Sequence, residues 1–455
     1  MPNRPRTQIF MASTLYGAAT LAAALDADRF APADRRLLLL SNNAATPETT
    51  ASLDTMPGFD RLSTRFDRVL SWNETISPFH PGGWSPRADD APLWERHLRL
   101  LWDLGDSPVE LIVESIQVNP ALALAQVFPG APLDVYADGL MSYGPTRNKL
   151  DPLIGTRIGR LLHLDLVPGL TPLLLTEFGV PAETVPTDAF LKVLTELAEA
   201  DELPQSGGEL EVPEGAALLL GQYLSALGIL TPEEEEELHV QMLRGAAERG
   251  HREIVFKPHP SAPARWSRLL EREAEKRDLA LTVLDRPVLA EVLYQRMRPA
   301  LVVGCFSTAL LTASTFYDLP TARTGTGLLL ERLAPYQNSN RIPVTIVDAL
   351  VPDLADRSAT PHTAPGDIAG LVTAVGYAMQ HQIYPNLRPA TERYLATRLD
   401  QHTWRYFKRR RLTALALPGA IPSQLAFIPR NATVRRVARR ARAVQRRLKK
   451  RAVFG

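Results

Sequence analysis

The feature that most constrains the fold is an alternation of strand-like and helix-like segments, which occurs twice along the chain. In the first part, the segments that read as strands are residues 7–13, 36–41, 109–115 and 133–136, with a helix-like stretch at 14–24. In the second part, the strand-like segments are residues 217–220, 253–256, 281–284 and 300–303, with a helix-like stretch at 231–249. Such alternation predicts parallel sheets in a βαβ arrangement. Because one hydrophobic core rarely grows beyond about 250–300 residues, the chain is expected to form two α/β domains.

The stretch between the two series predicts where the domains divide. Residues 198–215 are acidic, rich in Pro and Gly and poor in large apolar side chains, which is typical of a linker. We therefore expect an N-terminal domain at 1–197, a linker at 198–215, a C-terminal domain at 216–400 and a basic tail at 401–455.

Charge is distributed very unevenly, although the net charge is only +1. Residues 401–455 hold 16 Lys or Arg and no Asp or Glu, whereas residues 1–400 hold 35 basic and 50 acidic residues. Within the tail, residues 434–453 place a narrow apolar stripe on a helix otherwise covered by arginine. The stripe consists of Val434, Val437, Ala438, Ala441, Val444 and Leu448. This pattern predicts a C-terminal helix that lies on an anionic membrane surface.

Two other interpretations of the tail stay open. The other interpretations are a solvated segment that binds the acidic body of its own protein and, less favoured, a nucleic-acid-binding arm. No nucleic-acid motif accompanies the basic run, so we expect no nucleic-acid partner.

The single cysteine and the lengths of the apolar runs indicate in which cellular compartment the protein is expected. Cys305 stands alone, which excludes intrachain disulfides and any metal site built from several cysteines. The first ten residues lack the layout of a signal peptide, and no apolar run reaches the roughly 18–20 residues of a membrane-spanning helix. We therefore expect a cytoplasmic protein.

Three short segments carry the candidate chemistry, because ligands in open α/β sheets bind beyond the carboxyl ends of the strands. They are residues 136–139 (YADG), 257–260 (KPHP) and 304–308 (GCFST). In the last segment, Gly304 permits a tight turn, and Ser307 and Thr308 stand where a helix begins. Backbone N–H groups and hydroxyls there would bind a phosphate, although an ordinary helix cap is the simpler interpretation.

The other two segments offer an acid and a histidine. Pro258 and Pro260 stiffen the loop that presents His259, and Lys257 adds a positive charge. Asp138 would take a proton from an acceptor hydroxyl. Taken singly, His259 is also explained as a surface turn residue, and Asp138 with Gly139 as a common Asp-Gly turn.

Together these segments resemble the motifs of bacterial sialyltransferases: an (Asp/Glu)-(Asp/Glu)-Gly motif, an HP motif and a Ser/Thr-rich motif, in this order. The set is most similar to that of the bacterial α-2,8-polysialyltransferase family, over roughly residues 5–400. The resemblance implies a GT-B fold, in which two Rossmann-like domains face each other across a cleft. It also implies an inverting transfer from CMP-sialic acid, or a related CMP-activated acidic sugar, to a glycan acceptor, without a metal or other cofactor.

The resemblance assigns a role to each matching position. Asp138 matches the general base, His259 the histidine at the CMP phosphate, and Ser307 and Thr308 the hydroxyl pair at the donor. The motif departs from the family at Ala137, where the family has its first acidic residue. Further donor-side candidates are Lys257, Pro260, Gly304, Glu291, Gly221 and Gln222. The candidates on the acceptor side are Thr14, Tyr16, Gly17, Asn42 and Asn43, for which strand-end turns are the plainer interpretation.

The tail would suit an enzyme that acts on lipid-linked glycans while peripherally bound to the inner face of the cell membrane. Three other functions remain open. The chain would also suit a CDP-glycerol-type glycerophosphotransferase of teichoic-acid synthesis or a Kdo-transferring relative in capsule synthesis. From a different class, it would suit a non-catalytic membrane scaffold for glycan assembly.

Overall fold

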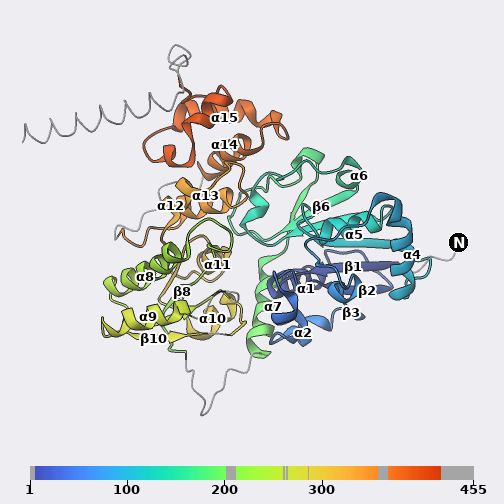
Figure 1. Ribbon diagram of the computed structural model, residues 1–455, viewed down its shortest axis with the longest axis horizontal. Coiled ribbons are helices and arrows are strands. Elements are labelled where there is room, and N and C mark those ends of the chain that lie inside the picture. The colour runs from blue at the N-terminus through green and yellow to red at the C-terminus, as the bar shows by residue number, and fades with distance from the viewer. Residues whose placement is uncertain are drawn as a thin grey trace, which may run out of the picture.

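The computed structural model describes residues 6–200, 212–259, 262, 265–284, 286–356 and 367–421. Two parallel sheets dominate it, one in each half of the chain. Figure 1 shows them side by side, with the helix that ends the first half between them. The expectation of two Rossmann-like α/β domains is confirmed.

The first sheet has seven strands in the order β3-β2-β1-β4-β5-β6-β7. Its strands are β1 (Thr7–Ala12), β2 (Arg35–Leu40), β3 (Arg68–Ser71), β4 (Val109–Glu114), β5 (Leu133–Ala137), β6 (Ile158–His163) and β7 (Ala182–Thr184). Every pairing is parallel. β1 is buried along its whole length, as expected of a central strand covered by helices on both faces. The strand order reverses between β1 and β4, which is where such sheets open a crevice for ligands.

The second sheet has five parallel strands in the order β10-β9-β8-β11-β12. Its strands are β8 (Ala217–Leu220), β9 (Glu253–Lys257), β10 (Ala280–Val283), β11 (Leu301–Gly304) and β12 (Thr321–Arg323). The corresponding reversal of strand order falls between β8 and β11. Both sheets therefore offer a ligand crevice at the carboxyl ends of their strands.

Helices cover both sheets. Those of the first half are α1 (Leu15–Asp26), α2 (Phe59–Ser63), α3 (Trp72–Thr75), α4 (Ala91–Leu101), α5 (Ala121–Val127), α6 (Pro152–Gly155) and α7 (Thr187–Ala200). Those of the second half are α8 (Pro232–Glu248), α9 (Arg265–Glu275), α10 (Ala290–Met297), α11 (Thr308–Phe316), α12 (Thr326–Arg332), α13 (Arg341–Leu350), α14 (Ile368–Gln380), α15 (Arg388–Arg398) and α16 (Arg409–Ala414). The capping box expected at Thr231 is present: its side chain accepts from the backbone N–H of Glu234, and the Glu234 carboxylate accepts from the backbone N–H of Thr231.

One apolar core spans both halves, and a second lies within the first half alone. α7 packs against α1 on one side and against α10 on the other, so it joins the domains beneath the cleft. At the other end, Tyr384 follows α14 and reaches the first domain, where its hydroxyl donates to Glu177 and contacts Thr146 and the carbonyl of Leu173. These contacts fix the position of the second domain relative to the first.

The basic segment expected at 401–455 is only partly described. Residues 401–421 form the short helices η8 (Thr403–Tyr406) and α16, in which Tyr406 and Leu412 are buried. This part is therefore folded onto the body of the protein and is not a free tail. The predicted helix at 434–453 lies outside the described residues, as does most of the expected linker.

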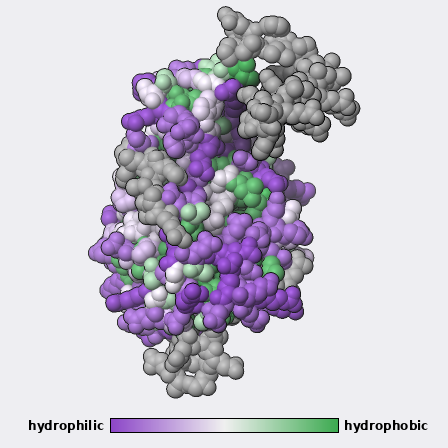
Figure 2. Space-filling model, turned by 90° about the vertical axis from the view of Figure 1, so that its left-hand side faces the viewer, coloured by the Kyte–Doolittle hydropathy of each residue, from purple (hydrophilic) through white to green (hydrophobic). Residues whose placement is uncertain are grey.

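The surface of the second domain is mainly hydrophilic, with apolar groups in small separate patches (Figure 2). Across the described parts of the chain, none of the helices combines the length and the apolar character needed to cross a membrane.

Candidate active site

A cleft of about 780 Å³ lies between the carboxyl ends of the two sheets. The first domain lines it with residues that follow β1, β2 and β5, and the second domain with residues that follow β9, β10 and β11. The predicted site residues in the lining are Thr14, Tyr16, Asn42, Asn43, Asp138, Lys257, His259, Glu291, Ser307 and Thr308. Residues that follow six separate strands are thus brought into one cleft.

Asp138 stands at the end of β5, on the first-domain side of the cleft. Burial raises its pKa to about 7, and the nearby charge of Glu114 is the second cause. Gly17 allows this placement, since a Cβ there would lie 3.3 Å from Asp138 Oδ2 and 3.0 Å from the Tyr136 hydroxyl. Near neutral pH, Asp138 can therefore both accept and release a proton, as a general base must.

Glu114, at the end of β4, is a second carboxylate that the sequence analysis did not single out. Its Oε2 accepts hydrogen bonds from the Ser13 hydroxyl at 2.5 Å and from the Ser13 backbone N–H at 3.2 Å. Burial raises its pKa as well, and the Ser13 hydrogen bonds oppose that rise. Because β4 and β5 are neighbours in the sheet, the charge of Glu114 acts directly on Asp138.

His259 and Lys257 face Asp138 from the second domain. Desolvation lowers the pKa of His259, and the charge of Lys257 lowers it further. Desolvation also lowers the pKa of Lys257, while the carboxylate of Glu291 opposes that shift. The ring of His259 lies 6.2 Å from the ring of Tyr223. Lys257 carries a positive charge beside the exposed ring of His259, and a cation next to a hydrogen-bonding ring favours binding of an anion such as a phosphate.

Ser307 and Thr308 mark the beginning of α11. The Ser307 hydroxyl caps the helix by accepting from the backbone N–H of Ala309 at 3.2 Å. Thr308 Oγ1 accepts from the backbone N–H of Leu140 at 3.4 Å, so this hydroxyl contacts the Asp-Gly loop of the other domain. Ser307 is thus the cap that the simpler interpretation expected, and the helix start still faces the cleft.

Glu291 and Tyr16 lie deeper. Glu291 is 3% exposed and accepts from the Thr312 hydroxyl at 2.7 Å, and burial raises its pKa. The Tyr16 hydroxyl has no hydrogen-bond partner within the described residues, and burial raises its pKa well above the ordinary value. A polar group that is buried without a partner is costly, which makes this hydroxyl available to a ligand in the cleft.

Three donor-side candidates support the cleft from behind and are not part of its lining. The side-chain oxygen of Gln222 accepts from the backbone N–H of Phe306 at 2.9 Å, which fixes the turn before α11. Gly221 packs against the ring of Phe256, and Gly304 against Leu310. Gly17, a candidate on the acceptor side, is also absent from the lining of the cleft. Pro260 lies outside the described residues.

Two acceptor-side candidates are engaged in loop structure. Thr14 caps α1 by accepting from the backbone N–H of Gly17. The Asn42 amide donates to Pro47 and Thr50, and its side-chain oxygen accepts from Ala44, so Asn42 holds the loop after β2 together. Among the residues that the structure describes, no three His, Cys, Asp or Glu side chains are grouped as metal ligands.

Comparison with known proteins gives a family match. The family model for alpha-2,8-polysialyltransferases matches residues 8–326, from β1 to the beginning of α12. A search of curated protein sequences finds no relative.

Solved structures resemble the chain only loosely. The UDP-GlcNAc 2-epimerase from Methanocaldococcus jannaschii is 11% identical, with a TM-score of 0.42 and coverage of 82% of this chain and 99% of that one. A sialyltransferase from Photobacterium damselae is 11% identical, with a TM-score of 0.38 and coverage of 75% and 96%. At such TM-scores, these likenesses add nothing to the assignment of the site.

Proposed function

Because this chain belongs to the alpha-2,8-polysialyltransferase family, and is therefore a glycosyltransferase, we propose that it transfers sialic acid, or a related acidic sugar, from a CMP-sugar to a glycan hydroxyl. The observation that carries the proposal is that Asp138 and His259 line the same cleft from opposite domains. Burial raises the pKa of the acid and lowers that of the histidine. A carboxylate whose pKa is near 7 can take up a proton close to neutral pH, as a general base must.

In the proposed reaction, Asp138 accepts the proton of the acceptor hydroxyl. The oxygen attacks the anomeric carbon of the donor, and the bond from that carbon to the phosphate oxygen breaks with inversion. The electron pair leaves with CMP. Lys257, His259 and the N-terminal end of α11 stabilise the phosphate, so that no metal ion is required.

His259 is suited to this role because its protonation depends on the donor. Desolvation and the charge of Lys257 lower the pKa of His259 and favour its neutral imidazole. A bound phosphate adds negative charge next to the ring and raises its pKa, which prepares it to donate a proton to departing CMP.

Titration of the protein with CMP tests the donor assignment. We expect wild type to bind CMP and His259→Ala to bind it about tenfold or more weakly, because a hydrogen bond to a charged group is lost. His251→Ala, before the opposite end of β9, is the matched control and should bind as wild type does. If His259→Ala bound CMP as tightly as wild type, the loop that carries His259 would not be the binding site of the CMP phosphate. Preference for CDP, with transfer of glycerol phosphate, would support the teichoic-acid alternative instead.

The pH dependence of the transfer rate tests the role of Asp138 when the neighbouring carboxylate, Glu114, is replaced. The rate should rise with pH as Asp138 loses its proton, near its pKa of about 7. Since the charge of Glu114 helps to raise that pKa, Glu114→Gln should move this rise to lower pH. Glu110→Gln, on the same strand, is the control that should leave the profile in place. An unchanged profile in Glu114→Gln would mean that Asp138 does not control the rate.

The basic segment is proposed to bring the enzyme to lipid-linked acceptors at an anionic membrane surface on the cytoplasmic side. Its charge, 16 basic residues without an acidic one in 401–455, supports this.

A further inference from the structure

The loop that follows β8 stands between the two segments that the proposed function assigns to the CMP phosphate. β8 is the middle strand of the second sheet, with β9 on one side and β11 on the other. The segment with Lys257 and His259 lies at the end of β9, and the turn before Ser307 follows β11. Residues 221–225, the β8 loop, are not part of the cleft lining, so they support both segments from behind.

Two contacts join the β8 loop to the segment after β9. The backbone N–H of Gly221 donates to the carbonyl oxygen of Lys257 at 2.9 Å. The absence of a side chain permits this approach, since a Cβ at Gly221 would lie 3.0 Å from Phe256 Cζ and 3.2 Å from the Lys257 carbonyl oxygen. Two residues further on, the centroid of the Tyr223 ring lies 6.2 Å from that of the His259 ring. The place of His259 in the cleft therefore depends on the β8 loop.

A third contact joins the β8 loop to the beginning of α11. The side-chain oxygen of Gln222 accepts from the backbone N–H of Phe306 at 2.9 Å, immediately before the Ser307 cap. This hydrogen bond connects the ends of two neighbouring strands, β8 and β11. One loop thus determines where both phosphate-binding segments stand relative to each other.

A buried carboxylate in turn holds the β8 loop. Glu235, in the first turn of α8, is fully buried. Its Oε1 accepts from the backbone N–H of Leu224 at 2.6 Å, and its Oε2 accepts from that of Ser225 at 2.8 Å. Hydrogen bonds to a charged group are stronger than those between neutral groups, and the N-terminal end of a helix favours a carboxylate. Both oxygens of Glu235 are thus engaged by the loop.

We propose that Glu235 is a positioning residue for the donor. Through the β8 loop, it sets His259 and the beginning of α11 at the spacing that the CMP phosphate requires. The inference rests on the proposed function, since it takes these two segments as the phosphate site. Segments that follow different strands bind one phosphate strongly only when they are already in place, because ordering them at the moment of binding costs affinity. Glu235 acts from outside the cleft lining.

A double-mutant cycle in CMP affinity tests the role of Glu235. Glu235→Gln keeps the size of the side chain but presents an amide NH₂ to one of the two backbone N–H groups, so that one hydrogen bond is lost and the loop shifts. We expect this variant to bind CMP about tenfold more weakly than wild type. His259→Ala should cost about tenfold in wild type but about threefold or less in the Glu235→Gln background, because His259 is already displaced there. Losses that simply add, or wild-type affinity in Glu235→Gln, would overturn the proposal.

Glu237→Gln is the matched control for this cycle. It removes a carboxylate from the same helix, but one whose side chain is 53% exposed and pairs with Arg244 at 3.5 Å. CMP affinity should be that of wild type, and His259→Ala should keep its full effect in this background. A coupling of the same size with Glu237→Gln would mean that loss of charge on α8, and not the position of the β8 loop, weakens CMP binding, which would also overturn the proposal.

Gln222→Met tests the β8 loop without a ligand and without changing Glu235. It keeps the length of the side chain but removes the oxygen that accepts from Phe306. In the free protein, we expect hydrogen–deuterium exchange at the backbone N–H of Phe306 to become about tenfold faster. Gln241→Met, at an exposed position on α8, should leave that exchange rate unchanged. An unchanged rate in Gln222→Met would contradict the inference, whereas absence of CMP binding in wild type would contradict the donor assignment itself, so the two failures are distinguishable.

Discussion

Asp138→Asn is expected to slow sugar transfer by about 10²–10⁴-fold and, at the same time, to make the protein more stable at pH 8. The amide keeps the shape of the side chain but cannot accept the acceptor proton. Stability rises because the carboxylate is held where ionisation is unfavourable: burial, and then the charge of Glu114, raise its pKa to about 7. A residue that served only the fold would lose stability when replaced.

The sign of the stability change follows from proton binding. In the unfolded chain, an aspartate ionises near pH 4, whereas folded Asp138 ionises near pH 7. Between these values the folded state binds more protons, so Asp138 makes stability fall as pH rises from about 4 to about 7. The asparagine variant lacks this loss, and its gain should therefore be small at pH 4 and reach about 2–4 kcal/mol above pH 7.

Thermal unfolding at pH 4 and pH 8, measured beside the transfer rate, checks both halves of this prediction. Asp134→Asn is the matched control, because Asp134 lies on the same strand but pairs with Arg160 away from the cleft. It should keep the transfer rate and lose some stability. A large loss of rate in Asp138→Asn without a gain in stability at pH 8 would mean that ionisation of Asp138 does not destabilise the folded protein.

Much of the site could be predicted because parallel strands place their carboxyl ends together. Asp138, His259 and Ser307 each follow a strand whose apolar run is plain in the sequence, and the cleft gathers all three. Glu114 also ends a predicted strand. Its importance depends on β4 lying beside both β1 and β5, and that order cannot be read from one sequence.

The strands that the sequence analysis missed, β3, β6, β7 and β12, each have a charged residue within them. β6 carries Arg160, which pairs with Asp134 on β5 and Glu183 on β7. Each charge interrupts an apolar run, and only pairing between strands satisfies it. The same applies to residues 401–421, where a high density of arginine conceals the buried side chains of Tyr406 and Leu412.

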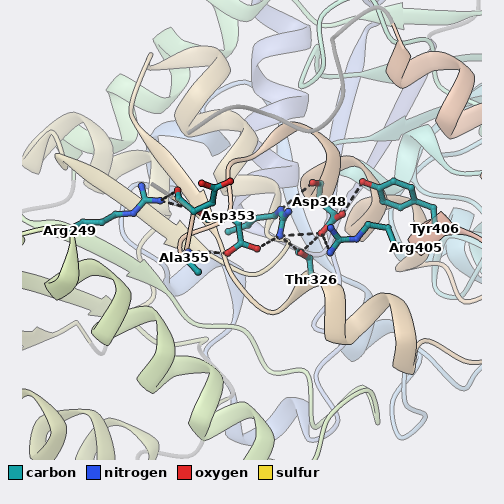
Figure 3. Close-up of polar contacts among 9 residues, drawn as sticks. Arg249, Thr326, Asp348, Asp353, Ala355, Arg405 and Tyr406 are labelled. Atoms are coloured by element: carbon teal, nitrogen blue, oxygen red, sulfur yellow. Dashed lines mark hydrogen bonds and ion pairs between the residues drawn. The ribbon is translucent and has the colours of Figure 1, made fainter. Parts of the chain in front are cut away.

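Residues 401–421 of the basic segment are attached to the body of the protein through a buried carboxylate, that of Asp348. Loss of this carboxylate should be the change that lowers the free energy of unfolding most. Asp348, on α13, is fully buried and accepts from Thr326 at 2.6 Å and from the Tyr406 hydroxyl at 2.9 Å (Figure 3). It also pairs with Arg405 at 3.1 Å and with Arg323, itself 1% exposed, at 3.2 Å. Removing one member of such a group leaves a buried charge without its partner, which costs about 3–5 kcal/mol.

Asp348→Ala is therefore expected to lower the thermal midpoint by about 3–5 °C, as measured by scanning calorimetry. Asp353→Ala is the informative comparison, because Asp353 binds the same arginine at 2.8 Å but its side chain is 35% exposed. Water replaces much of what that variant loses, so its cost should be about 1 kcal/mol. Equal losses in the two variants would mean that burial of Asp348 does not determine its contribution. A larger loss in Asp348→Ala, together with proteolytic cleavage near Arg405, would show that this carboxylate holds the start of the basic segment on the enzyme.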